Sequence, residues 1–267
     1  MPIRRKGENY NPALMRKHHH PRLSPDKTLV TSQLNDTTYD HGVHEYATIG
    51  VKGNFLEAQA KINLWKPFIE ADELSISQIW VATLDKDINT IEVGWEEDGY
   101  VNTGCYNLLC DGFVHTSSNV SLGCSFSEVS TFNDDQKDVT FIIHKWTLVD
   151  TITRYSNRLL SKFSLHGIIK SSNNSIRGGE IIDRTKGRHT STQMGSGHFP
   201  SEGGLKTSSY FNWVQVIDED NAMKNPENVE TYITNPNCYD LKITDDNYDT
   251  NGYSFYYGDP DYNDRCQ

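Results

Sequence analysis

Two short segments that contain glycine each place one carboxylate where it could activate water. In "TIEVGW", residues 90–95, Glu92 alternates with apolar side chains, so on a strand the two kinds point to opposite faces. In "RGGEII", residues 177–182, Glu180 follows two glycines, which remove neighbouring side chains. Two acids on one sheet face push their pKa values apart, leaving one ionised as a base and one protonated as an acid. Such a pair can hydrolyse an amide or a glycosidic bond, although a lone Glu on the wet face of an antiparallel strand is also ordinary.

Other patterns that could bind a metal or supply a nucleophile are weaker. The motif "HGVHE", residues 41–45, and the run at residues 18–20 invite a metal site, but their spacing matches no standard zinc pattern. We interpret these side chains as surface histidines and expect neither a metal nor a cofactor. The chain has no G-x-S-x-G motif for a serine nucleophile, and no oriented base is evident beside Cys124. Carboxylate chemistry is therefore the strongest candidate.

The spacing of apolar residues predicts strands along most of the chain. In "NFLEAQAKINLW", residues 54–65, apolar and polar side chains alternate throughout. Turns rich in Gly, Asn, Asp and Ser separate this segment from further strand-like segments. Those segments are 74–83, 89–95, 139–148, 178–183, 209–218 and 252–258. The pattern predicts an all-β fold, specifically an antiparallel β-sandwich.

Length and charge restrict the classes of function. A chain of 267 residues is long enough for one large all-β domain, which we place at residues 44–267. The formal net charge of -11 argues against a nucleic-acid partner, and no apolar run is long enough to span a membrane. Residues 1–43 read as a basic, proline-containing arm, because residues 1–30 carry seven basic and two acidic side chains.

The five cysteines and three glycosylation motifs are consistent with a secreted chain. The segment "CYNLLC", residues 105–110, could close a short loop, and Cys238 with Cys266 could tie down the C-terminus, which leaves Cys124 unpaired. Five reduced cysteines are the alternative. Motifs for N-glycosylation occur at three asparagines, and no signal peptide is evident at the start of the chain, which conflicts with secretion. The three are Asn35, Asn119 and Asn173.

Several longer motifs, in this order, resemble the neprosin family of plant secreted proteins. The resemblance covers about residues 44–267, and "MPIRRK" at the start looks like the end of the family's N-terminal activation segment. The motifs are "KINLWKPFIEADELSISQIWV", "IEVGW", "DGYVNTGCYNLLCDGFV", "TSTQMGSGHFPSEG", "YFNWVQVID", "CYD" and "GYSFYYGDP" with a final cysteine.

The resemblance implies a sandwich with glutamic peptidase chemistry that cleaves after proline in an acidic medium. The catalytic glutamates of the family look like those of "I-E-x-G-W" and "G-G-E", which here are Glu92 and Glu180. Glu202, in a glycine-rich segment, is a second-choice partner. Under the resemblance the disulfides are Cys105–Cys110 and Cys238–Cys266, and the substrates are proline-containing peptides or proteins. Gln78, Trp80 and Gln193 are candidates to line the substrate cleft.

Two departures from the family pattern support a competing hypothesis. The segment "EEDGY" follows "IEVGW" directly, where the family has an additional loop and strand, so we expect a missing strand. The residue before "G-G-E" is Arg177 instead of tryptophan, and a cation near Glu180 would favour its ionised form. The alternative is a catalytically inactive, secreted binding or structural protein, and a glycosidase is a weaker third reading. We expect a monomer in each case.

Overall fold

The regular structure of the chain consists of β-strands. The computed structural model describes residues 22–23, 29–30, 42–83, 89–97, 125–144, 172–185, 187–218, 220–244, 252–258 and 266. All elements in these ranges are strands with antiparallel pairing, which confirms the all-β prediction. None of these residues belongs to a helix that could cross a membrane.

Twelve strands are defined by the described residues. They are β1 (Arg22–Leu23), β2 (Leu29–Val30), β3 (Val43–Asn63), β4 (Leu74–Thr83), β5 (Asn89–Glu97), β6 (Asp138–His144), β7 (Ser172–Asp183), β8 (Ser209–Asp218), β9 (Met223–Lys224), β10 (Glu230–Ile233), β11 (Asp240–Ile243) and β12 (Phe255–Gly258). Strands β1 and β2 pair only with each other, within the predicted basic arm.

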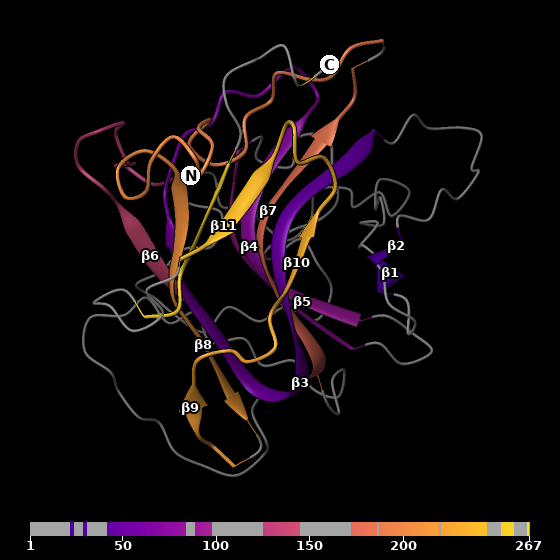
Figure 1. The fold of residues 1–267 in the computed structure, drawn as a ribbon, viewed down its shortest axis with the longest axis vertical. Helices are drawn as coiled ribbons and strands as arrows, with labels where there is room; N and C mark the ends of the chain where they lie inside the picture. Colours follow the sequence, from indigo (N-terminus) through magenta and orange to yellow (C-terminus); the bar gives the residue numbers. More distant parts are fainter. Residues whose placement is uncertain are drawn as a thin grey trace, which may run out of the picture.

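The other ten strands form one hydrogen-bonded sheet that is organised around β3. The main path is β11-β12-β8-β3-β7-β4-β5, while β6 and β10 also pair with β3 and β9 pairs with β8. Residues 43–52 of β3 pair with β7, and the register shifts between Lys52 and Phe55. Beyond this shift the strand pairs with β8 and β6. Figure 1 shows β3 as a long, curved ribbon that joins the two halves of the sheet.

The two halves of the sheet share one apolar core. The main buried cluster contains Ile79 and Ile181 from the β5-β4-β7 half and Ile49 from β3. It also contains Phe211 and Phe255 from the β8-β12 half. Ala58, Ala60, Ile62 and Leu64 of the predicted apolar face are buried. Gln59 and Asn63 of the predicted polar face are buried too, so the alternation of residue types is not matched by an alternation of burial. Hydrogen bonds connect all ten strands into one sheet, so the division into the two sheets of a sandwich stays a prediction. The loss of a strand relative to the family also stays a prediction.

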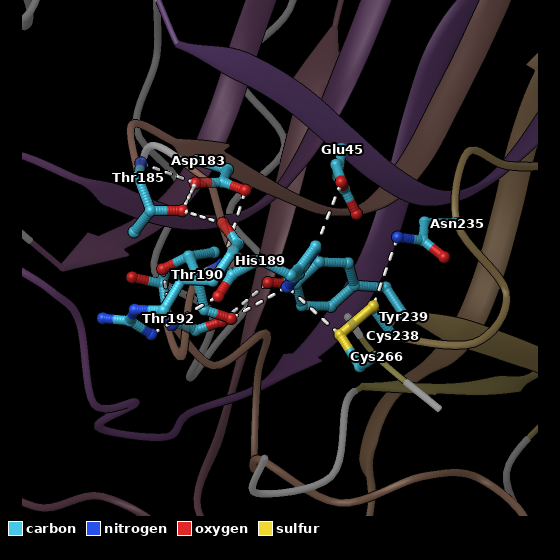
Figure 2. Close-up of a disulfide and its surroundings, with 11 residues drawn as sticks. Glu45, Asp183, Thr185, His189, Thr190, Thr192, Asn235, Cys238, Tyr239 and Cys266 are labelled. Atoms are coloured by element: carbon cyan, nitrogen blue, oxygen red, sulfur yellow. Dashed lines mark hydrogen bonds and ion pairs between the residues drawn. A yellow bond between two sulfur atoms is a disulfide. The ribbon is translucent and has the colours of Figure 1, made fainter. Parts of the chain in front are cut away.

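The C-terminus is joined to the body by a disulfide between Cys238 and Cys266, as the family resemblance implied (Figure 2). Both half-cystines are buried. The other predicted pair, Cys105–Cys110, and the odd residue Cys124 lie outside the described residues. Of the three glycosylation motifs, those at 35 and 119 also lie outside, and Asn173 is the second residue of β7.

Removal of this disulfide is expected to reduce stability markedly. The bond closes a loop with a sequence separation of 28 residues, and loop-closure entropy for that length corresponds to about 3–4 kcal/mol. The double variant Cys238→Ala/Cys266→Ala should therefore lose about that much free energy of unfolding in urea. A loss below about 1 kcal/mol, with the wild type shown to be oxidised by mass spectrometry, would contradict the expectation.

Candidate functional site

Strand register places the two predicted glutamates on one face of the sheet. Glu92 of β5 lies opposite Trp80 of β4, which lies opposite Ile176 of β7. Glu180 of β7 lies opposite Ile76 of β4, which is four residues from Trp80. Residues that lie opposite one another on neighbouring strands form a row, and on this face two such steps separate the row of Glu92 from that of Glu180. Because residues that differ by an even number share a face, Glu92 and Glu180 project to the same side. We call this side, with Gln78 and Tyr46, the glutamate face.

The row between the two glutamates contains two glycines. Gly94 lies opposite Gln78, and Gln78 lies opposite Gly178. A Cβ at residue 94 would stand 2.1 Å from the carbonyl oxygen of Ser77, so no larger residue fits there without movement of β4. Glycine is therefore required in this row by the close approach of the neighbouring strands.

Glu92 and Glu180 lie on opposite sides of this row, on two strands that are separated by β4. In a flat sheet, four residues along the strand (~13 Å) and two strand spacings (~10 Å) separate their Cα atoms by roughly 16 Å. The side chains shorten this gap. Gln78 Nε2 donates to Glu92 Oε2 at 3.0 Å, so the Glu92 carboxylate is held by a residue that lies one row nearer to Glu180.

Glu180 accepts from two side chains of β3. The phenol of Tyr46 donates to Glu180 Oε1 at 3.0 Å, and His44 Nδ1 lies 2.6 Å from the same oxygen. His44 is only 19% exposed and its ring stacks beside Tyr46. The interpretation of His44 as a surface histidine is therefore wrong, because its ring is partly buried against Glu180.

Tyr46 is a buried phenol that donates to Glu180. It is 2% exposed, and its ring packs at a tilt against Tyr232 of β10 with the ring centroids 5.9 Å apart. Burial raises the pKa of Tyr46 well above its usual value, and the charges of Glu180 and Glu92 raise it further. The phenol therefore stays protonated through the acidic and neutral range and remains a hydrogen-bond donor to Glu180.

The four remaining cleft candidates separate into two pairs. Gln78 and Trp80 lie on the glutamate face and are buried. Gln193 and Glu202 lie in the loop that connects β7 to β8. Gln193 exchanges hydrogen bonds with the backbone of Phe68, at 2.8 Å in both directions. Glu202 is exposed and accepts from the Phe199 amide, with His198 Nδ1 3.0 Å from its other oxygen. The register thus brings Gln78 and Trp80, but not this loop pair, into the rows of Glu92 and Glu180.

Arg177 does not lie beside Glu180, as the sequence had led us to expect. Arg177 and Glu180 are three residues apart on β7, so their side chains leave the sheet on opposite faces. The guanidinium is fully buried in the core, in the same row as Ile79 and Ile49, where its Nη2 donates to the carbonyl oxygen of Gln215 at 3.1 Å. The expectation that Arg177 lies near Glu180 and favours its ionised form is therefore not supported by the positions of the two side chains.

Sequence reasoning missed the contribution of β3 to the site. His44 and Tyr46 are two residues apart, so their alternation could have assigned them to one face of a strand. The pairing of Tyr46 with Glu180, 134 residues later, depends on the register of β3 against β7. No local sequence signal specifies that register.

A comparison with known families identifies the family of the chain. The chain matches the family model for Neprosin over residues 93–260. This range is more than half of the 267 residues, it contains Glu180, and it begins one residue after Glu92. It also contains Cys238, while Cys266 follows it. The chain therefore belongs to the neprosin family, which confirms the resemblance.

Proposed function

We propose that this protein is a glutamic endopeptidase that uses Glu92 and Glu180 to activate water and cleaves after proline at acidic pH. Membership of the neprosin family links the chain to peptidase-like function at the level of the family. The observation that carries the proposal is the strand register that brings both glutamates onto one face of the sheet, where Tyr46 donates a hydrogen bond to Glu180.

The proposed reaction needs one base and one acid. Glu180 takes a proton from a water molecule, and the hydroxyl oxygen attacks the carbonyl carbon of the peptide bond. Protonated Glu92 then gives its proton to the leaving nitrogen as the C–N bond breaks, so one water is consumed and two peptides are formed. The glycine-containing row between the acids is where a water molecule and an extended peptide would lie.

Tyr46 and His44 fit the role of positioning residues for Glu180 in this proposal. A carboxylate that accepts hydrogen bonds is held in one orientation and favoured in its ionised form. Tyr46 supplies such a bond at every acidic pH, because burial keeps its phenol protonated. His44 Nδ1 contacts the same carboxylate oxygen at 2.6 Å and helps to fix its position. Both arrangements suit a base.

One observation favours the inactive alternative, a secreted binding or structural protein. Glu57 of β3 makes a contact with His144 of β6 that has the same 2.6 Å length as the contact between Glu180 and His44. A strand-face Glu–His pair is therefore not unique to the glutamate face, and such pairs also serve as structural ion pairs. Under this alternative, the contact between His44 and Glu180 is structural and no water is activated. Secretion belongs to both proposals and is supported by the disulfide.

The test of the proposal is hydrolysis of a proline-containing peptide by the purified, folded chain between pH 2 and pH 7, with the products mapped by mass spectrometry. The peptidase proposal predicts activity that rises toward acidic pH and products that end in proline. Absence of cleavage at every pH, by a chain that circular dichroism shows to be folded at pH 4, would support the inactive alternative. Cleavage at other residues would refute the proline preference alone.

Loss of the Tyr46 hydroxyl is expected to lower activity without unfolding the protein. A hydrogen bond to a charged group contributes about 1.5–3 kcal/mol, which corresponds to about 10–100-fold in kcat if the bond holds the base in place. Tyr46→Phe should show this loss. Tyr210→Phe is the matched control, because Tyr210 is also buried and donates to Asp138 at 2.9 Å away from the glutamate face. Equal kcat losses in both variants would show a general stability effect instead.

A further inference from the structure

We propose that Glu45, Asp183 and His189 form a binding site for a divalent transition-metal ion such as Zn²⁺ on the face of the sheet opposite to the glutamate face. Each residue offers one ligand atom, and these atoms lie within 4.8 Å of one another. The site is separate from the proposed peptidase chemistry and does not depend on it. It shares only Glu45 with the "HGVHE" segment that the sequence suggested as a metal site, and it uses neither histidine of that segment.

The backbone holds the two carboxylates as neighbours. Val43 lies opposite Asp183 and Glu45 lies opposite Ile181 in the β3–β7 ladder, so Glu45 and Asp183 are diagonal neighbours on one face. The loop after β7 then returns His189 over this pair (Figure 2). A cation at this position would connect two central strands to the loop.

Glu45 and His189 are buried side by side, and one polar atom of each has no hydrogen bond within the described residues. Glu45 is 7% exposed and His189 is 8% exposed. Glu45 Oε2 and His189 Nε2 are buried without a hydrogen bond, although Nε2 lies 3.2 Å from Glu45 Oε1. A buried polar atom without a partner is costly, and a positive ion between these atoms would satisfy both of them.

The orientation of the His189 ring matches that of a metal ligand. His189 Nδ1 lies 2.8 Å from the carbonyl oxygen of Thr190, which can only accept, so the proton of a neutral ring belongs on Nδ1. Nε2, which lies 3.2 Å from Glu45 Oε1, is then the ring nitrogen that can bind a cation. Metal-binding histidines usually donate their other ring N–H to a carbonyl or carboxylate in this way.

Asp183 is held in place by similar supporting bonds. Its Oδ1 accepts from the amide of Thr185 at 2.8 Å and from the Thr185 hydroxyl at 2.6 Å, and Oδ2 lies 3.4 Å from the amide of Thr190. Asp183 is partly exposed, so an ion could enter from that side. Two carboxylates and a neutral imidazole carry two negative charges, which a divalent ion neutralises, and imidazole favours Zn²⁺ over Mg²⁺.

The nearby disulfide offers a rival explanation that an experiment can separate. Cys266 Sγ lies 3.1 Å from His189 Nδ1, and His189, Cys238 and Cys266 also have potential ligand atoms within 4.8 Å. In the oxidised protein the two sulfurs bond to each other. A site that used them would therefore bind metal only after reduction.

The experiment is calorimetric titration of the full, oxidised chain with Zn²⁺ at pH 7, in a background in which residues 18–20 are changed to Ala to remove a competing histidine run. We expect one tight site per chain, lost or at least about 10-fold weaker in Glu45→Gln and in His189→Gln. Asp183→Asn should also weaken Zn²⁺ binding, and it keeps the Oδ1 acceptor for Thr185. Because residue 183 is less buried than Glu45 and His189, this variant tests the site even if the other two variants misfold. His198→Gln is the matched control, since the His198–Glu202 pair has no third ligand among the groups found in the described residues.

Three outcomes would overturn the metal site. The first is that folded protein shows no saturable binding of Zn²⁺. The second is that Glu45→Gln and Asp183→Asn bind Zn²⁺ as tightly as the wild type does. The third is that binding appears only after the disulfide is reduced. The first would leave a proton-mediated Glu45–His189 ion pair as the explanation of the close contact. None of these outcomes bears on peptide hydrolysis, so failure of the metal site and failure of the proposed function can be told apart.

Discussion

Glu180→Gln and Glu92→Gln are each expected to lower kcat on a proline-containing peptide by about 10²–10⁴-fold, the range that a positioned general acid or base contributes. Glutamine keeps the size of the side chain and an oxygen that can accept from Tyr46 or Gln78. It cannot exchange a proton in the acidic range. The loss should therefore appear mainly in kcat, while circular dichroism and the unfolding midpoint stay close to those of the wild type.

The chain supplies a matched control for this prediction in Glu57. Glu57 lies on the same long strand as Tyr46 and contacts a histidine at the same distance as Glu180 does, but in the other half of the sheet. Glu57→Gln should therefore retain activity within a few-fold. If Glu57→Gln and Glu180→Gln lose the same amount, the activity depends on Glu–His pairing in general, and the assignment of Glu180 as the base is wrong.

Arg177→Met is expected to stabilise the protein by about 1–4 kcal/mol, the gain seen when buried charges are replaced by apolar residues of similar volume. Arg177 is fully buried, and its Nε and Nη1 have no hydrogen-bond partner. Burial lowers the pKa of Arg177 to about 9. A shift from the ordinary value of 12.5 to about 9 corresponds to a cost on the order of 5 kcal/mol for keeping the charge in the core at pH 7.

The sign of this prediction follows from the ionisation of the two states. The unfolded chain keeps Arg177 charged in water at no cost, whereas the folded chain pays the burial cost at every pH below about 9. Methionine removes that cost and leaves only the Gln215 carbonyl without its donor, at about 1–3 kcal/mol. Urea unfolding at pH 7 measures the difference, and the m-value should stay the same.

The control for the arginine is Arg188, which forms an exposed ion pair with Glu70 at 2.8 Å. Arg188→Met should change stability by no more than about 0.5 kcal/mol. A loss of more than about 1 kcal/mol in Arg177→Met would mean that the buried guanidinium is better satisfied than its single hydrogen bond implies, and the account of this core position would be wrong.

The sequence was informative where the pattern is local. Period-two alternation around Ala58 and Ala60 identified buried side chains of β3, and alternation around Glu92 identified the face that carries it. The same rule, applied to Arg177 and Glu180, would have placed them on opposite faces, and the expectation that they lie side by side overlooked it. That error came from reading distance along the chain as distance in space.

Features that depend on pairing between distant segments could not be read in this way. The contact of Tyr46 with Glu180 needs the exact β3–β7 register, and the grouping of Glu45 with His189 needs the return of a loop 144 residues later. A shift of one residue in the β3–β7 register would move the side chains of one strand to the other face. Strand alternation and neighbouring glycines singled out Glu92 and Glu180 as a possible pair, and the family motifs pointed to the same two residues.

The most direct test of the central claim is kcat of the double variant Glu92→Gln/Glu180→Gln compared with both single variants. Residues that act as one unit give strongly non-additive losses, because removal of either already stops the shared step. We predict that the double variant is no slower than about 10-fold below the slower single variant. Losses that multiply, so that the double variant falls by the product of the two single effects, would contradict a mechanism in which the two carboxylates work on one water.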